Sequence, residues 1–215
     1  MRVAQRALRI EPFHVMEVAK AARALDRPTG HDRPPMLYLN IGEPDFTAPP
    51  LVVQAGERAL REGRTQYLPA LGLESLRERL SQWYRDRFGL SVPARRIVIT
   101  AGASAALQLA CLALIEAGDE VLMPDPSYPC NRQFVQAAQG QAVLLPCEAA
   151  QRYQLSAAQV REHWGTNTRG VLLASPSNPT GTSMAASELR EIHQVVSQHG
   201  GITLVDEIYL GLSFD

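Results

Sequence analysis

The sequence has 215 residues, of which 46% are apolar and 20% are charged, and its formal net charge is -1. This length suits one sizeable core, or one domain and part of another, and the composition is that of an ordinary globular protein. A charge so close to zero gives no reason to expect a nucleic-acid or membrane partner. The sequence contains no signal-like or membrane-length apolar stretch, so we expect a cytoplasmic protein.

The cysteines and histidines predict neither a disulfide framework nor a metal site. Cys111, Cys130 and Cys147 are odd in number and lack a CxxC spacing, so three reduced thiols are expected. The five histidines form no HxxxH or HExxH pattern, and each is most simply a surface or partly buried residue. Of the 21 basic residues only Lys20 is a lysine, which matters for the chemistry considered below.

The first part of the chain predicts helices joined by irregular segments. A helix over Pro12 to Leu25 carries an apolar stripe, turn-forming residues fill Asp26 to Pro35, and a short strand is expected over Met36 to Asn40. Two further helices are predicted over Pro50 to Glu62, with a proline at its start, and over Leu73 to Phe88.

From Arg96 onward, short β-branched runs alternate with helical segments. The predicted strands are Ile97–Thr100, Glu120–Met123, Ala142–Leu145, Gly170–Ala174 and Ile202–Val205. Helices are expected between them, at Ser104–Glu116, Asn131–Ala138, Ser156–His163 and Ala185–His199. Apolar runs separated by helices predict an α/β fold, in which a mostly parallel central sheet is covered by helices on both faces. Ligands in such sheets bind beyond the carboxyl ends of the strands.

Unusual short motifs follow four of these strands, where the fold would place a site. Ala101–Ala106 leads straight into a helix, whose first amides and Ser104 hydroxyl could hold a phosphate. The structural alternative is a plain tight turn with Ser104 as the helix N-cap. Pro124–Pro129 presents Tyr128, whose ring could stack on a flat heterocycle or simply pack.

The other two motifs supply an amide and a carboxylate. Ser175–Gly181 holds Asn178 rigidly enough to donate to a ring oxygen, although Asn-Pro and Thr-Gly are also common in turns. Asp206 ends what is expected to be a buried central strand, with no basic residue nearby, so a protonated pyridine nitrogen would suit it as a partner. An N-cap on a following helix is the alternative. Tyr209 could donate to the phenolic oxygen of the same ring.

At these motifs the sequence resembles the class I and II aminotransferases, which are fold-type-I enzymes dependent on pyridoxal phosphate (PLP). The resemblance is co-linear and rests on six elements: Asn40–Asp45, Gln66–Arg77, Gly102–Ser104, Asp125–Pro129, Ser177–Gly181 and Asp206–Tyr209. It implies that PLP is the cofactor. The implied roles are phosphate binding by Ala103 and Ser104, ring stacking by Tyr128, bonds to the ring oxygen from Asn178 and Tyr209, and pairing of the ring nitrogen with Asp206.

The resemblance also implies an assembly and a reaction. Tyr67 would reach the cofactor phosphate of a neighbouring subunit in a homodimer with shared active sites, while Gly42 and Asn178 would lie beside the substrate. Residues 1–40 would be a helix and strand of the small domain or arm, and residues 41–215 an incomplete PLP-binding large domain. The implied reaction moves an amino group between an amino acid and a 2-oxo acid.

The family attaches PLP to a lysine that follows the Asp-x-x-Tyr element, and this sequence has no lysine after Tyr209. We therefore expect the chain to be a fragment that is inactive by itself. Three alternatives remain open at this point: a PLP-dependent lyase or synthase acting at Cα or Cβ, a non-enzymatic PLP-sensing or interaction domain, and a generic phosphate- or nucleotide-binding α/β domain. Product analysis would distinguish a lyase or synthase from an aminotransferase, and titration with PLP would distinguish a nucleotide-binding domain from a PLP-binding one.

Overall fold

The computed structural model describes residues 2–26 and 36–212, and its internal contacts divide the chain into two units. One unit consists of residues 14–100, and the other combines the segment up to Phe13 with the chain from Ala101 onward. Most of the predicted irregular stretch, Asp26 to Pro35, lies outside the described residues. The division at residue 40 into an arm and a large domain stays a prediction.

The unit of residues 14–100 contains the three helices that the sequence predicts. They are α2 (His14–Leu25), α3 (Pro50–Arg61) and α4 (Glu74–Phe88), and a short 3₁₀ turn, η1 (Ala94–Arg96), follows. Local signals set their ends. Pro50 occupies the first turn of α3, and Gly89 ends α4 with φ 67°, a left-handed conformation that glycine adopts without a Cβ clash.

The two strands predicted within residues 36–100 are wrong. Residues 36–40 and 97–100 are not part of any sheet, although Ile97 is extended, with φ -104° and ψ 128°. The amide of Ile99 donates to the carbonyl oxygen of Leu71 (3.1 Å), which is a single loop contact. A strand needs a neighbouring strand whose N–H and C=O groups pair with its own, and the described part of this unit contains no strand.

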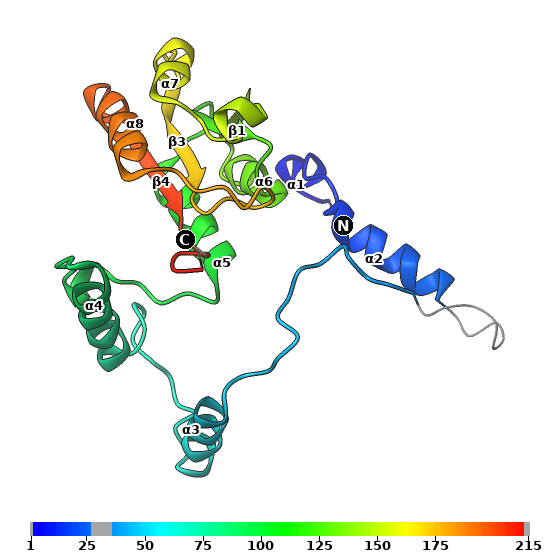
Figure 1. The fold of residues 1–215 in the computed structure, drawn as a ribbon, viewed down its shortest axis with the longest axis vertical. Coiled ribbons are helices and arrows are strands. Elements are labelled where there is room, and N and C mark those ends of the chain that lie inside the picture. Colours follow the sequence, from blue (N-terminus) through cyan, green and yellow to red (C-terminus); the bar gives the residue numbers. More distant parts are fainter. Residues whose placement is uncertain (1, 27–35, 213–215) are drawn as a thin grey trace. The chain divides into compact units, whose positions relative to one another are not determined.

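The other unit is built around a parallel sheet (Figure 1). Its strand order is β2-β1-β3-β4, with bounds β1 (Glu120–Asp125), β2 (Gln141–Pro146), β3 (Thr168–Ala174) and β4 (Ile202–Asp206). Helices connect successive strands and one precedes the sheet; they are α5 (Ala103–Leu114), α6 (Pro129–Ala137), α7 (Ala157–His163) and α8 (Ala186–Gln198). A short helix α1 (Gln5–Leu8) contacts α6, and a 3₁₀ turn η2 (Ala149–Gln151) precedes α7. The predicted α/β class is confirmed.

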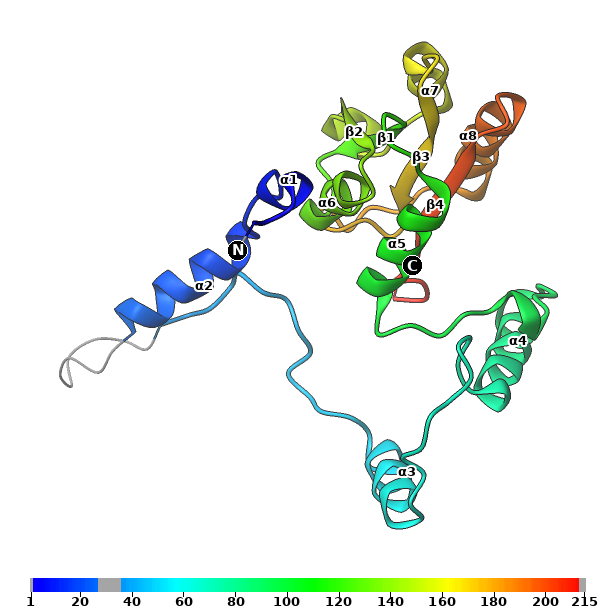
Figure 2. The ribbon, with the colours of Figure 1, turned by 180° about the vertical axis from the view of Figure 1, so that it is seen from behind.

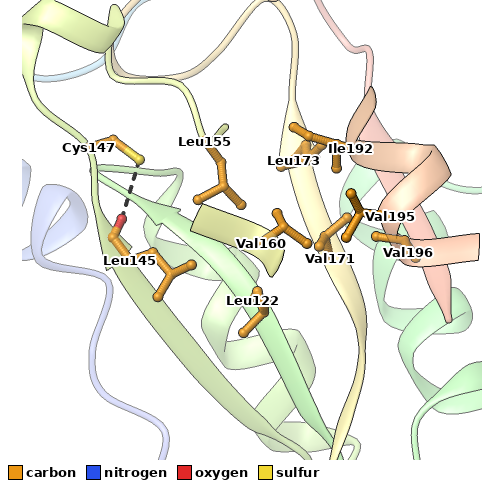
Figure 3. Close-up of a cluster of buried hydrophobic side chains, with 10 residues drawn as sticks. All are labelled: Leu122, Leu145, Cys147, Leu155, Val160, Val171, Leu173, Ile192, Val195 and Val196. Atoms are coloured by element: carbon orange, nitrogen blue, oxygen red, sulfur yellow. Dashed lines mark hydrogen bonds between the residues drawn. The ribbon is translucent and has the colours of Figure 1, made fainter. Parts of the chain in front are cut away.

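Alternate side chains of the inner strands face two different helical layers, because side chains point to opposite faces of a strand with period two. Val121 and Met123 of β1 pack with α5 and α6, whereas Leu122 of the same strand packs with α7 and α8. Figure 2 shows the sheet and its helices from behind, and Figure 3 shows the cluster that contains Leu122. In that cluster the Cys147 thiol donates to the carbonyl oxygen of Leu145 (3.4 Å). Each fully buried Leu or Val contributes about 1.5–3 kcal/mol to folding.

The prediction of a buried central strand at residues 202–205 is wrong in its placement. In the described sheet β4 pairs with β3 alone, and all five of its residues are partly exposed. An apolar run indicates that side chains tend to be buried, but it does not say how many strands lie beside it.

Buried thiols occupy the core on both sides of the sheet. Cys111 and Cys147 are buried and free, and burial raises the pKa of each, that of Cys111 to about 11. At neutral pH both therefore behave as small apolar side chains. Along residues 2–26 and 36–212, no helix combines the length and apolar character needed to cross a membrane.

Candidate functional site

The strand order creates a crevice between the carboxyl ends of β1 and β3. The chain leaves β1 through α6 towards β2 on one side, and leaves β3 through α8 towards β4 on the other. Loops that diverge from neighbouring parallel strands in this way leave room for a ligand. Tyr128 follows β1 and Asn178 follows β3, so both side chains enter the site from the two strands that flank the crevice.

A cavity of about 290 Å³ lies at this edge of the sheet. It is lined by six residues that the sequence analysis singled out: Ala103, Ser104, Tyr128, Asn178, Asp206 and Tyr209. Its other lining residues are Ala101, Gly102, Leu107, Ala174, Pro176 and Ile208. Leu107, Ala174 and Ile208 were not predicted as site residues; Ala174 ends β3 and Ile208 follows β4 closely, so the strand-end rule could have found these two. Residues spread over a hundred positions of sequence thus share one cavity.

The start of α5 offers the cavity a set of backbone amides. Gly102 is the N-cap residue with φ 84°, and no side chain caps the helix. Ser104 lies inside the helix, so its alternative assignment as the N-cap is wrong. The first turn holds no acidic residue, and the N–H groups and helix dipole at such an end favour an anion. Phosphate is among the anions that bind at such a helix start.

Tyr128 has close neighbours at its hydroxyl and at its ring. A hydrogen bond with the Cys130 thiol, together with burial and the nearby Tyr209 and Asp206, raises its pKa to about 12. The ring of Phe13 meets the Tyr128 ring edge-on, with the centroids 6.0 Å apart and an angle of 74° between the planes. Tyr128 therefore presents a neutral, oriented aromatic ring to the cavity.

Asn178 lies on a tight turn that is closed by backbone hydrogen bonds. The Gly181 amide donates to the Ser177 carbonyl oxygen (2.8 Å), and the Ser177 amide donates to that of Thr182 (2.9 Å). The Asn178 amide nitrogen lies 3.5 Å from the Tyr209 hydroxyl, at the outer limit of a hydrogen bond. An amide and a phenol thus converge at one wall of the cavity, where both can donate to a single ligand oxygen.

Asp206 ends β4 and is partly exposed, so the prediction of a buried carboxylate is wrong. One carboxylate oxygen accepts the Ile208 amide (3.0 Å), which orients the side chain, and the Asp206 carbonyl oxygen accepts the Ser175 amide (3.1 Å). Residues 208–211 form turns, so the alternative of a helix N-cap is wrong as well. Within the described chain Asp206 takes part in no ion pair, which leaves its charge available to a cationic ligand.

Two predicted site residues belong to the unit of residues 14–100 and do not line this cavity. The side chain of Tyr67 is fully exposed, and a Cβ added to Gly42 would meet no atom within 4 Å. Their proposed contacts with a neighbouring subunit and with substrate stay predictions.

Comparison with known proteins gives a consistent set of matches. The model of the family described as Aminotransferase class I and II matches residues 34–215. The valine–pyruvate aminotransferase of Mycobacterium tuberculosis is 37% identical over 213 residues, which cover 99% of this chain and 53% of that protein. The (5-formylfuran-3-yl)methyl phosphate transaminase of Methanocaldococcus jannaschii is 32% identical, with the same coverage of both chains.

Solved structures of aminotransferases match the fold of this chain. An aminotransferase from Mycobacterium tuberculosis has a TM-score of 0.88 at 36% identity, and the match covers 96% of this chain and 52% of that one. The alanine aminotransferase of Pyrococcus furiosus has a TM-score of 0.91 at 28% identity, with coverage of 100% and 54%. The chain therefore spans about half the length of the relatives that it matches.

Proposed function

Because this chain belongs to the class I and II aminotransferase family, we propose that it forms the cofactor-binding part of an enzyme that uses PLP to move an amino group between an amino acid and a 2-oxo acid. One observation carries the proposal. The start of α5 and the segments at the ends of β1, β3 and β4 supply a single cavity with an anion-binding helix start, an aromatic ring, an amide beside a phenol, and a carboxylate.

These groups fit the chemistry of PLP at both of its charged ends. The amides of Ala103 and Ser104 suit the phosphate, because they lie in the first turn of an uncapped helix. Asp206 suits a protonated pyridine nitrogen, because its carboxylate has no ion-pair partner among residues 2–26 and 36–212. Between these ends, Tyr128 would stack on the ring, while Asn178 and Tyr209 would donate to its phenolic oxygen.

When bound, PLP supplies a ring that withdraws electrons from the Cα atom of an amino acid. The contribution of this chain is to bind and orient that ring. Asp206 would hold a proton on the ring nitrogen, which strengthens the electron withdrawal, and the amide of Asn178 would fix the orientation of the ring oxygen. Tyr128, whose pKa is raised to about 12, would cover one face of the ring as a neutral phenol.

Amino transfer in this family also requires a lysine, and the sequence offers only Lys20, which lies in α2 of the unit of residues 14–100. We infer that the chain holds the cofactor by noncovalent contacts and does not catalyse amino transfer unaided. Reduction with borohydride, which fixes a lysine-bound cofactor, should therefore leave PLP removable by dialysis. Stable incorporation of one PLP per chain would contradict this inference.

A homodimer with shared sites is the remaining part of the proposal. Tyr67 supports it, because this tyrosine lies between α3 and α4 with a fully exposed ring that is available to another subunit. Replacement of Tyr67 by Phe should weaken PLP binding without changing the sedimentation coefficient of the dimer. A monomer in sedimentation experiments on the complete enzyme would contradict this part.

Titration with PLP tests the central proposal. We expect saturable uptake by the protein, followed through the absorbance of the bound cofactor, and Asp206→Ala should weaken it about tenfold, since a hydrogen bond to a charged group contributes about 1.5–3 kcal/mol. In the complete enzyme the same substitution should largely abolish amino transfer while circular dichroism stays unchanged. Binding of a nucleotide in preference to PLP, or near-normal turnover of Asp206→Ala, would overturn the assignment.

A further inference from the structure

The turn that carries Asn178 is held from outside the cavity by a polar contact with Gln154. This side chain is 5% exposed, and its amide nitrogen donates to the Thr182 carbonyl oxygen (2.9 Å) and lies 3.2 Å from the Thr182 hydroxyl. The same carbonyl oxygen accepts the Ser177 amide that closes the turn. Thr182 is therefore the residue through which a buried amide outside the cavity contacts the loop of Asn178.

Arg152 adds charged contacts to the same segment. Its guanidinium donates to the Ser183 carbonyl oxygen (2.9 Å) and to both carboxylate oxygens of Glu188 (2.6 and 2.7 Å), while the Thr182 hydroxyl donates to the Arg152 carbonyl oxygen (2.7 Å). Glu188 in turn accepts the Ala185 amide (2.7 Å) at the start of α8. Hydrogen bonds from Arg152 and then from Ala185 hold the pKa of Glu188 below its usual value. The loop is thus tied at Ser183 and at α8.

The backbone at Arg152 is strained in a way that needs such support. Arg152 and Tyr153 have φ values of 54° and 56°, a left-handed conformation that residues with a Cβ rarely adopt. Two such residues in succession persist only where the surrounding contacts determine the conformation, and strain of this kind gathers near functional sites. Two kinds of contact hold this backbone. The amides of residues 152–154 donate to carbonyl oxygens of residues 148–151, and Arg152 and Gln154 contact residues 182–188.

We propose that Arg152 and Gln154 are positioning residues, which hold Thr182 and thereby fix Asn178 at the wall of the cavity. That the ligand is PLP rests on the proposed function. That Arg152 and Gln154 hold the loop of Asn178 does not rest on it. Neither side chain lines the cavity, so their influence on a ligand must pass through the loop.

Two variants and one control test the inference. Arg152→Asn removes the guanidinium but keeps a residue that tolerates left-handed backbone, and Gln154→Ala removes the buried amide. Arg61→Ala serves as the control, because it breaks an exposed ion pair with Glu57 (3.0 Å) in the unit of residues 14–100. Hydrogen exchange at the Gly181 amide reports on the loop, and exchange at Val121 in β1 reports on overall stability.

In both variants we expect Gly181 to exchange about tenfold faster while Val121 changes little, and the dissociation constant for PLP to rise about three- to tenfold, as for the loss of one or two hydrogen bonds. The control should match the wild type in all three measurements. An unchanged Gly181 rate, or equal acceleration at Gly181 and Val121, would overturn the positioning role. Faster exchange with unchanged PLP affinity would overturn the link to Asn178. If the wild type itself takes up no PLP, the proposed function fails, and the exchange rates alone decide the inference about the loop.

Discussion

Tyr128 shows how one residue is tuned by its immediate neighbours. The hydrogen bond with Cys130 favours the neutral phenol over the phenolate, and burial acts in the same direction. A pKa that is higher in the folded than in the unfolded state adds stability below pH 10, and this contribution is lost as the pH rises towards 12. The ring at the cavity therefore stays uncharged up to a higher pH than an ordinary tyrosine does.

Replacement of Cys130 by Ala should lower the pKa of Tyr128 from about 12 towards its ordinary value of 10.0, because the largest cause of the shift is removed. Ultraviolet absorbance of the phenolate during an alkaline titration measures the change, with Tyr128→Phe identifying the signal. Cys130→Ser, which keeps a hydroxyl in place of the thiol, is the matched control and should retain most of the shift. Equal pKa values in Cys130→Ala and the wild type would refute the assigned cause.

The sequence identified the residues of the cavity better than those that support it. Tyr128, Asn178 and Asp206 could be predicted because each follows an apolar run that reads as a strand, and parallel strands bring their carboxyl ends to one edge. Gln154 and Arg152 could not be predicted as supporting residues. Their partners Thr182 and Glu188 lie 28 and 36 residues away, and a contact over such a distance leaves no periodic pattern in the sequence. The partial exposure of Asp206 was missed because the apolarity of β4 does not reveal that it lies at a sheet edge.

At the scale of elements, helices were predictable and strands only in part. The ends of α3 and α4 follow from Pro50 and Gly89, which act locally through their own backbone preferences. A strand depends on a partner strand distant in sequence. Ile97–Thr100 has the composition of a strand, and Ile97 has an extended backbone, but the segment is not part of a sheet in the described chain. Because the pairing of β3 with β4 depends on close approach of the two strands, one added atom at the contact can weaken it.

Gly170 is the position where that sensitivity can be measured. A Cβ added there would collide with the carbonyl oxygen and side chain of Ile202, so Gly170→Ala should destabilise the protein by about 1–3 kcal/mol. Gly56 lies inside α3 with no atom near an added Cβ, so Gly56→Ala should stabilise that helix by about 0.5–1 kcal/mol. Denaturation by urea, followed by circular dichroism, measures the effect of Gly170→Ala on the sheet, and hydrogen exchange of the α3 amides measures the effect of Gly56→Ala. A free energy of unfolding that is unchanged in Gly170→Ala would show that β3 and β4 can move apart to accept the added methyl group.

At the scale of the whole molecule, the two units differ in how much each buries. Among the described residues of 14–100, Ala19 is the only buried one, and the leucine and valine side chains of α3 are exposed, with Leu51 at 78%. The other unit contains two buried apolar clusters, one on each face of its sheet. Since most helical stability in proteins comes from packing, a helix of 12 residues without a buried face is marginal in water.

Native-state hydrogen exchange should therefore separate the units. Amides of β1 and β3 open only with the sheet and should be protected by roughly a thousandfold or more, as expected for a domain of ordinary stability. Amides within α3 should exchange within about tenfold of the rate of an unfolded chain, because opening this helix exposes almost no additional apolar surface. Gly56→Ala supplies an internal control, since it should slow exchange in α3 by only a few fold while leaving β3 unchanged. Protection of α3 equal to that of β3 would show instead that its exposed leucine and valine side chains are covered in solution.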